Sequence, residues 1–326
     1  MMRTTMKHVA AEDVSRTLVS VAICTLNRAS LLSKTLSTFT SVVIPSGFDW
    51  ELVIVDNGSS DETAAVVESF EGRLPIRREV ELRRGQSVAR NRVLSSYGGS
   101  FILWTDDDVE VDPQWITSTL DAFDAFEADV VFGRSFPVWM TSAPRWFGPL
   151  FAGQFALLDY GPEAFTVTDG EHQFYGLNMA FRRSAVETLG GFREDLGYVG
   201  NSSGGADDTD MFNRALTKGL RIVYAPQSVV GHAIPPDRTT KARQRRLAWT
   251  GARSNYRLVA QQFASLPQVF GLPRFMYRLA AADARDFVTN TLLCKASESF
   301  YNEIRLIRFA GLVKESFQKS RATLES

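Results

Sequence analysis

The sequence predicts an α/β fold in which helices flank a mostly parallel, Rossmann-like sheet, followed by a helical C-terminal extension. Between residues 18 and 133, short apolar runs alternate with segments of helical periodicity, the pattern of parallel strands joined by crossover helices. Three of the apolar runs end in polar residues, and open α/β sheets bind their ligands beyond the carboxyl ends of the strands. The fold class therefore also predicts where a binding site lies.

The elements of this first half follow from their apolar pattern and from the turn or capping residues that bound them. Strands are expected at Leu18–Cys24, Trp50–Val55, Ile76–Leu82 and Phe101–Trp104. Helices are expected at Ala29–Phe39, Asp61–Phe70 and Gln86–Ser95, with a further helix starting at Pro113. Ser59, Ser60 and Asp61 are the expected caps of the second helix, because their side-chain oxygens can accept bonds from free backbone N–H groups.

The second half is less regular. The segment from Ser135 to Gly161 mixes aromatic residues with prolines and glycines, which indicates an irregular insertion. Beyond it, helices are expected at Arg183–Leu189 and up to Lys218, and a strand at Ser228–Val230. Residues 275–317 mix apolar and charged side chains, which is typical of amphipathic helices that pack on a domain or lie on a bilayer.

Composition and charge exclude several classes of function. A net charge of −1 and a pI near 6.4 offer no general attraction for nucleic acid, and no nucleic-acid-binding motif occurs. Cys24 and Cys294 stand alone in the sequence, which favours a reducing compartment over a disulfide framework. Neither a secretory signal nor an apolar run of the roughly 20 residues that span a bilayer is present. We expect a cytoplasmic protein, soluble or peripheral on the cytoplasmic face of the inner membrane.

Three adjacent carboxylates follow the strand expected at Phe101–Trp104. Asp106, Asp107 and Asp108 would repel one another at the edge of a core unless a cation lay among them. In an extended chain the first and third point to one side and Asp107 faces away, so Asp106 and Asp108 are the candidate metal ligands. Oxygen ligands of this kind favour Mg²⁺ or Mn²⁺, and either ion neutralises a diphosphate without a glycine-rich cradle. An Asp-rich turn before the next helix is the alternative.

Four motifs together resemble a known family. The runs 21–28 (VAICTLNR), 53–61 (VIVDNGSSD) and 85–91 (GQSVARN), followed by 106–108 (DDD), are similar in order and spacing to those of the family 2 glycosyltransferases of the GT-A fold. The resemblance covers roughly residues 20–232 and implies a nucleotide-sugar donor, a divalent metal and an inverting transfer. The expected division is an N-terminal tail (1–17), a catalytic domain (18–235) with a nucleotide-sugar half (about 18–133) and an acceptor half (about 134–235), and the extension (236–326).

The resemblance also implies roles by position. Contacts with the nucleotide sugar are implied for Thr25, Asn27, Arg28, Asp56, Arg84, Arg90, Asp106 and Asp107. Asp106 and Asp108 are the implied metal ligands. His232 joins them, since it lies about where relatives place a histidine near the diphosphate or metal, although a lone histidine is more often structural. The expected donor is a UDP-sugar.

Asp207, Asp208 and Asp210 form a second acidic cluster, which resembles the acceptor-side acidic motif of the family with Asp207 in place of the usual glutamate. An inverting transfer needs one carboxylate to take the proton of the acceptor hydroxyl, and Asp208 is expected to be this base. Asp207 is the second catalytic candidate and is expected to orient the acceptor. Asp210 is expected on the acceptor side, where it supports the base. The alternative is an acidic first helical turn favoured by the helix dipole.

Two further stretches are candidate binding surfaces. Trp139 and Trp146, in the aromatic insertion, are expected to contact the acceptor, with core packing as the alternative. The run from Arg238 to Arg257 holds seven basic residues and no acidic one. This run suits the binding of a diphosphate or peripheral contact with an anionic membrane. The simpler explanation of the basic residues is a solvated helix face.

These observations predict a metal-dependent, inverting, hexosyltransferase-like enzyme of polysaccharide or cell-envelope synthesis. It would transfer a sugar from a nucleotide-diphosphate sugar to a glycan or lipid-linked acceptor. Residues 244–249 (QRRLAW) do not match the Q-x-x-R-W pattern of processive synthases, which favours the addition of single sugars. The same residues leave open a nucleotidyltransferase, and a catalytically silent nucleotide-sugar or glycan-binding protein.

Overall fold

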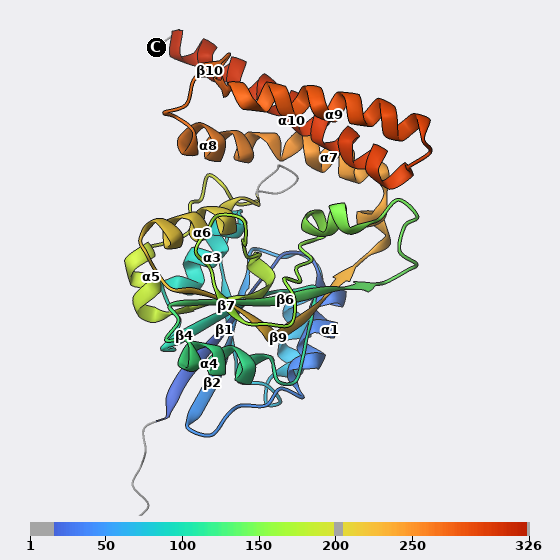
Figure 1. Ribbon diagram of the computed structural model, residues 1–326. Coiled ribbons are helices and arrows are strands. Elements are labelled where there is room, and N and C mark those ends of the chain that lie inside the picture. The colour runs from blue at the N-terminus through green and yellow to red at the C-terminus, as the bar shows by residue number, and fades with distance from the viewer. Residues whose placement is uncertain (1–15, 199–204, 325–326) are drawn as a thin grey trace, which may run out of the picture.

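A nine-stranded sheet forms the centre of the computed structural model, which describes residues 16–198 and 205–324 (Figure 1). The strand order is β3-β2-β1-β4-β8-β6-β9-β5, and β7 pairs with β9. These strands are β1 (Thr17–Thr25), β2 (Phe48–Asp56), β3 (Ile76–Val80), β4 (Phe101–Asp106), β5 (Val109–Val111), β6 (Val130–Trp139), β7 (Phe165–Thr166), β8 (Met179–Arg182) and β9 (Ile222–Ile234). A separate hairpin joins β10 (Gln268–Val269) to β11 (Leu272–Pro273).

Helices cover both faces of the sheet and form a layer at one end of the molecule (Figure 1). The α-helices are α1 (Ala29–Phe39), α2 (Thr63–Phe70), α3 (Gln86–Leu94), α4 (Trp115–Ala125), α5 (Arg183–Leu189), α6 (Asp207–Thr217), α7 (Lys241–Thr250), α8 (Ala252–Gln262), α9 (Arg274–Leu292) and α10 (Ala296–Leu324). Short 3-10 helices are η1 (Pro149–Phe155), η2 (Gly176–Asn178) and η3 (Pro236–Thr239). The α/β fold with its helical C-terminal part is confirmed.

The parallel half of the sheet contains the elements that the sequence predicts best. β1 pairs in parallel with β2 and β4, and β2 pairs in parallel with β3. β8 then runs antiparallel between β4 and β6, which pairs in parallel with β9. Because β1, β2 and β4 point the same way, their carboxyl ends and the loops that follow lie at one edge of the sheet.

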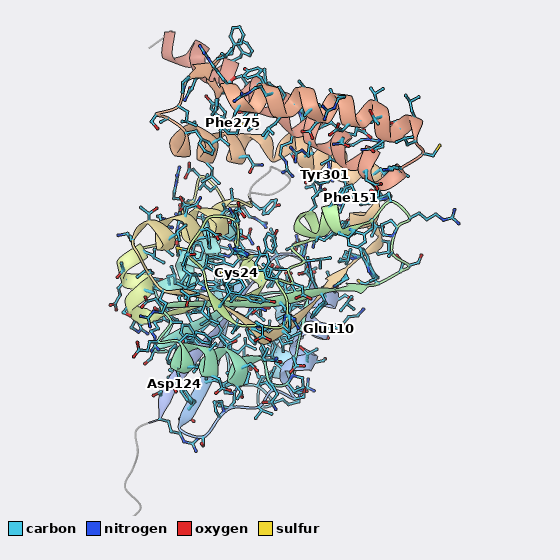
Figure 2. The ribbon with its side chains drawn as sticks, viewed as in Figure 1. Cys24, Glu110, Asp124, Phe151, Phe275 and Tyr301 are labelled. Atoms are coloured by element: carbon cyan, nitrogen blue, oxygen red, sulfur yellow. The ribbon has the colours of Figure 1, made fainter. Side chains whose placement is uncertain are left out.

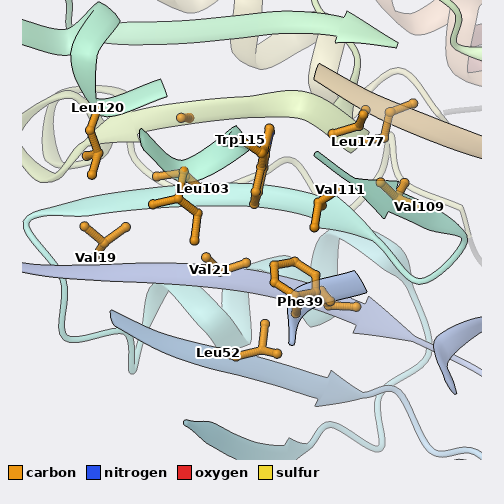
Figure 3. Packing of buried hydrophobic residues seen from close by; sticks show 14 of the residues in the cluster. Val19, Val21, Phe39, Leu52, Leu103, Val109, Val111, Trp115, Leu120 and Leu177 are labelled. Carbon is orange, nitrogen blue, oxygen red and sulfur yellow. The ribbon is translucent and has the colours of Figure 1, made fainter. Parts of the chain in front are cut away.

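The core has two parts, one on each face of the sheet. Residues of β1 alternate between them, with Val19 and Val21 on the face covered by α1, α2 and α4, and Ala22 on the face covered by α3, α5 and α6. Figure 3 shows the first of these faces, where Phe39 of α1 and Trp115 of α4 pack against the strands. The alternation of side chains along a strand therefore also decides which side chains contact which helices.

The helical extension rests on the insertion between β6 and α5. Phe300 and Ile304 of α10 are buried with Trp146 and Phe151 in one apolar cluster. The ring centroids of Phe151 and Tyr301 lie 5.6 Å apart. Figure 2 labels both residues where the extension meets the insertion. Among the helices of residues 16–198 and 205–324, none has the length and apolar composition that crossing a bilayer requires.

Four expectations about elements need correction. The segment starting at Ser135 is expected to be irregular. Its first residues, 135–139, instead form a regular strand, because they extend β6 beside β9. The helix expected from Asp61 begins at Thr63, whose N–H bonds to the Asp61 carboxylate (3.1 Å). The expected caps Ser59 and Ser60 bond to Asn27 instead. The strand expected at 228–230 is the middle of the long strand β9. The expected tail at 1–17 lies mostly outside the described residues.

Candidate active site

A cavity of about 500 Å³ opens at the carboxyl edge of the sheet, between the loops that follow the strands and α7. Nine of the expected site residues line it: Thr25, Arg28, Arg90, Asp106, Asp107, Asp108, Asp207, Asp208 and His232. They come from the ends of β1 and β4, from β9, and from the start of α6 and the body of α3. Segments far apart in the sequence thus bring two acidic clusters to one cavity.

The first cluster surrounds the end of β4. Asp107 accepts hydrogen bonds from the Thr25 hydroxyl (2.7 Å) and from Arg28 (2.9 Å), and the same guanidinium donates to Asp108 (2.7 Å). The expectation that Asp107 faces away is wrong, because β4 ends at Asp106 and the next two residues form a turn. Strand alternation ends where the strand ends, so all three carboxylates reach the cavity.

These carboxylates differ in their affinity for a proton. Burial raises the pKa of Asp106, and it raises the pKa of Asp107 to about 6 although Arg28 opposes the shift. Burial also opposes ionisation of Asp108, but His232 and two arginines outweigh it and hold the pKa of this carboxyl well below its usual range. The cluster therefore carries one firmly ionised carboxylate and two whose negative charge is incompletely compensated.

His232 is fixed by its neighbours. Its Nδ1 lies 2.6 Å from the Phe155 carbonyl oxygen, which can only accept, so Nδ1 carries a proton. In the neutral ring Nε2 is then the acceptor, and Arg238 donates to it over 2.9 Å. The same Nη1 of Arg238 lies 3.2 Å from Asp108. The lone pair of His232 Nε2 is thus taken by Arg238 in this structure, and Nε2 lies 3.5 Å from Asp108. This tautomer is the one in which Nε2 binds a metal once such a donor withdraws.

The second cluster lies at the start of α6. Asp207 is almost completely buried and accepts from Arg90 (2.9 Å) and from the Ser87 hydroxyl (3.0 Å). Arg90 reaches it only because residue 176 is a glycine, since a Cβ there would lie 2.2 Å from the guanidinium. Asp208 instead accepts from two backbone N–H groups, those of Gly176 (3.0 Å) and Thr209 (2.7 Å). The two neighbouring aspartates therefore lie in different surroundings.

Asp208 has the properties of a proton acceptor. Burial and the adjacent charge of Asp207 raise its pKa to about 6, although Arg90 and the two backbone donors oppose the shift. A carboxylate with a pKa near the working pH takes a proton more readily than an ordinary one, which remains ionised. Its side chain borders the cavity, whereas Asp207 is held against Arg90. Asp208 is chemically suited to act as a base, and Asp207 is placed to fix Arg90.

Six expected site residues are not brought to the cavity lining. Asn27 and Asp56 shape the loop after β2, where they accept from the backbone N–H groups of Ser60 and Ser59 (both 2.7 Å). Arg84 is exposed beside Gly58. The other three are Asp210, which pairs with Arg214 (2.8 Å), and Trp139 and Trp146, which pack in the aromatic cluster under α10.

The aromatic insertion contributes to the cavity through different residues. Gly153, Gln154 and Ala156 line it, while the tryptophans hold the insertion to α10. Arg238, Arg243 and Arg246 of the basic run also line it. The tyrosines Tyr175 and Tyr198, which sequence reasoning missed, complete the lining. No motif marks either tyrosine, because each arrives through a loop whose path the local pattern does not specify.

The carboxylate cluster fits a divalent cation that draws part of its ligands from elsewhere. The described residues, 16–198 and 205–324, contain no group of three or more His, Cys, Asp or Glu side chains arranged to hold an ion. Among the described side chains, however, Asp106 faces the cavity with only a distant guanidinium partner, Arg90 at 3.9 Å. Mg²⁺ and Mn²⁺ sites often use one or two carboxylates and complete their shell with substrate phosphates and water. The donor set is consistent with such a site.

Comparison with known proteins places this geometry in context. Residues 20–190 match the sequence profile described as "Glycosyl transferase family 2". The chain is 26% identical over 301 residues to the succinoglycan biosynthesis protein ExoM of Rhizobium meliloti (strain 1021), covering 90% of this chain and 91% of that protein. It is 28% identical over 232 residues to a glucosyl-dolichyl phosphate glucuronosyltransferase of Haloferax volcanii, covering 68% and 71% of the two chains.

Solved structures share the fold. The mannosyltransferase PcManGT from Pyrobaculum calidifontis, solved in complex with GDP-Man and Mn²⁺, superposes with a TM-score of 0.57 at 18% identity, covering 94% of this chain and 90% of that one. TarS residues 1–349 from S. aureus, solved with UDP-GlcNAc, gives a TM-score of 0.53 at 16% identity, covering 94% and 92%. At these identities the likeness shows a GT-A-like architecture that extends through the C-terminal helices.

Proposed function

This chain belongs to glycosyltransferase family 2 and is a glycosyltransferase, and we propose that it transfers one sugar at a time, with inversion, from a nucleoside diphosphate sugar to a hydroxyl group of a lipid-linked glycan. The acceptor oxygen forms a bond to the anomeric carbon while the bond from that carbon to the diphosphate breaks. The hydroxyl proton goes to Asp208, and a nucleoside diphosphate leaves.

One observation carries this proposal. Asp208 lines the same cavity as Asp106 and Asp108, although the two clusters are about a hundred residues apart in sequence. The pKa of Asp208 near 6 leaves it ionised at neutral pH yet basic enough to accept a proton. Asp207 acts through Arg90, which also approaches Asp106 and so connects the two clusters.

A divalent metal is part of the proposal. Asp106, Asp108 and His232 would hold it, with Mn²⁺ or Mg²⁺ as the ion, and it would stabilise the negative charge of the departing diphosphate. Asp108 stays ionised because of its arginine neighbours. His232 would offer the lone pair of Nε2, which in this structure accepts from Arg238. Arg28 and Arg238, already held by these carboxylates, are placed to meet phosphate oxygens.

Relatives support the acceptor class. One is named for succinoglycan biosynthesis, and another for transfer to glucosyl-dolichyl phosphate, a lipid-linked sugar. Both descriptions fit addition of a sugar to a growing, lipid-linked chain. A UDP-sugar remains the expected donor, and a cytoplasmic location with peripheral contact at the inner membrane remains a prediction for the basic C-terminal segment. The side chains of Arg253 and Arg257 in that segment lie outside the described part of the protein.

A thermal-shift screen tests the proposal directly. UDP-glucose, UDP-glucuronic acid, UDP-GlcNAc and GDP-mannose are each added with Mn²⁺ or with EDTA. We expect one donor class to raise the melting temperature only with the metal, and Asp108→Ala to abolish that rise. Asp121→Ala, which removes an exposed carboxylate on α4, is the matched control and should retain the rise in melting temperature. An equal rise in Asp108→Ala would refute the metal assignment.

The products separate the proposal from the alternatives that the sequence leaves open. A glycosyltransferase releases a nucleoside diphosphate from its sugar donor, whereas a nucleotidyltransferase consumes a nucleoside triphosphate. Coupled detection of released UDP or GDP, run with ATP, CTP, GTP and UTP as parallel substrates, distinguishes the two. Consumption of a triphosphate without release of diphosphate from any sugar donor would overturn the proposed reaction.

A further inference from the structure

The wall of the cavity that faces the carboxylates is basic. Arg243 and Arg246 of α7 line it, together with Arg238 just before that helix. Burial raises the pKa of Tyr198 at this wall, and the charges of Arg238 and Arg243 oppose the shift. In Figure 1 the helical layer that carries these residues lies over the catalytic domain. The cavity therefore has one acidic and one basic side.

Arg308 of α10 adds a further charge to this side. Phe300, Ile304, Arg308 and Leu312 follow one another at intervals of four and so share a face of the helix. Phe300 and Ile304 are buried against the insertion, and Leu312 is buried with α8, but the arginine between them stays exposed. Arg308 is therefore the exposed, charged member of an otherwise buried apolar stripe.

The direction of Arg308 follows from the groups on which its charge acts. Its positive charge lowers the pKa of Tyr175, against the rise that burial produces, and Tyr198 acts on Arg308 in return. Both tyrosines line the cavity. Surrounding protein lowers the pKa of Arg308 itself by desolvation. The charge of Arg308 therefore acts on tyrosines of the cavity, although Arg308 itself is not among the residues that line it.

Two of these arginines have no acidic partner. Within the described part of the chain, the side chains of Arg246 and Arg308 form no hydrogen bond or ion pair. Arg243 pairs with Asp237 through Nη1 (2.9 Å), but its buried Nε has no acceptor among the described residues. A buried N–H group without an acceptor is costly, and such groups are commonly satisfied by a ligand.

We propose that Arg243 and Arg246 of the cavity wall form an anion subsite that binds the phosphate or diphosphate group of the lipid-linked acceptor, and that Arg308 contributes its charge from outside the cavity lining. The proposal rests on the proposed function, which assigns the donor diphosphate to the opposite, carboxylate side of the cavity. A neutral sugar acceptor needs hydroxyl-binding groups and gains nothing from three guanidinium groups, whereas a phosphate accepts several charge-assisted hydrogen bonds at once. The subsite would orient the acceptor so that its hydroxyl faces Asp208.

Two sources of phosphate can be distinguished, the acceptor lipid and the donor diphosphate. Isothermal titration with farnesyl diphosphate in detergent reports on the first, with farnesol as the uncharged comparison. Titration with UDP and Mn²⁺ reports on the second and also checks the proposed function independently. The variants are Arg246→Gln, Arg308→Gln and the double variant. Arg278→Gln on α9, exposed and outside the cavity lining, removes the same charge from the same helical layer.

We expect each single variant to weaken farnesyl diphosphate binding about tenfold and the double variant about a hundredfold, the scale of charge-assisted hydrogen bonds. UDP binding, farnesol binding and the melting temperature should stay unchanged, because neither side chain has an internal partner to lose. Arg278→Gln should behave as the wild type. Equal weakening of UDP would assign the subsite to the donor, and unchanged farnesyl diphosphate binding would show that these arginines form only a solvated face. Either result overturns the proposal.

Discussion

The two acidic clusters of the cavity have the same residue type but different surroundings. At the end of β4, the charges of Asp107 and Asp108 are met by Arg28 and Arg238. At the start of α6, arginines pair with Asp207 and Asp210, whereas no arginine of the described residues pairs with Asp208 between them. The number of carboxylates therefore does not decide their chemistry. The position of each guanidinium decides it, because a neighbouring guanidinium determines which carboxylate stays firmly ionised.

Exposure separates the two clusters further. The Arg90 and Asp207 side chains are 4% and 1% exposed, so their pair is withdrawn from water. Arg28 is 37% exposed and shares its charge between two carboxylates. The α6 pair is therefore a structural connection within the protein, whereas the β4 cluster remains open to a ligand. Substitutions in the two clusters test this difference.

Arg90→Gln should destabilise the fold by about 3–5 kcal/mol, because it leaves the buried Asp207 carboxylate without its cation. Arg28→Gln should cost less, roughly 1–2 kcal/mol, since Asp108 keeps Arg238 and His232 as partners. Urea unfolding of both variants measures the difference. If Arg28→Gln proved the more destabilising of the two, the distinction between a structural pair and an open cluster would be wrong.

Asp208→Asn should lower the rate of sugar transfer by a hundredfold or more, about 2.7 kcal/mol in activation free energy, because the amide cannot accept a proton. Donor affinity should be retained. Asp210→Asn, in the same helical turn but outside the cavity, is the matched control and should keep activity within a few-fold. Initial rates with the donor identified by the thermal-shift screen provide the test, and full activity of Asp208→Asn would mean that another group takes the proton.

The pH dependence of the transfer rate should report the ionisation of the same group, Asp208. Burial raises the pKa of Asp208 to about 6, so the carboxylate is protonated and inactive below that value. The transfer rate should therefore fall about tenfold per pH unit below pH 6 and level off above it. The residual activity of Asp208→Asn should not show this fall below pH 6. A rate that stays constant from pH 7 down to pH 5 in the wild type would contradict the assignment.

The smallest expected effect is on stability. A carboxyl group whose pKa is raised on folding favours the folded state below its unfolded pKa, near 4, and loses that contribution as the pH rises through about 6. Asp208→Asn removes the cost of the ionised form and should stabilise the protein by on the order of 1 kcal/mol at pH 7.5. The gain should vanish near pH 4. Thermal unfolding at both values measures it, and a destabilised variant at pH 7.5 would argue against a strained carboxylate.

The parallel half of the fold could be predicted because its signals are local. The helix at Ala29–Phe39 has the predicted bounds, and β1, β2 and β4 extend the predicted strands by one or two residues at their ends. The insertion was predicted less well, since residues 135–139 form a strand through pairing with β9, a partner some ninety residues away. Helical and strand periodicity indicates which side chains of a segment are buried. It does not indicate the strand with which that segment pairs, because the partner lies elsewhere in the sequence.

The candidate site divides in the same way. The sequence by itself determined that two acidic clusters follow structural elements at one edge of an α/β sheet, because each motif is contiguous and its element is local. The tertiary structure alone decided which carboxylates are neutralised, through Arg90 and Arg238, whose partners lie 117 and 130 residues away. It also placed Trp146 in the core rather than at the cavity. Electrostatic pairing and burial depend on distance in space, which a linear pattern does not contain.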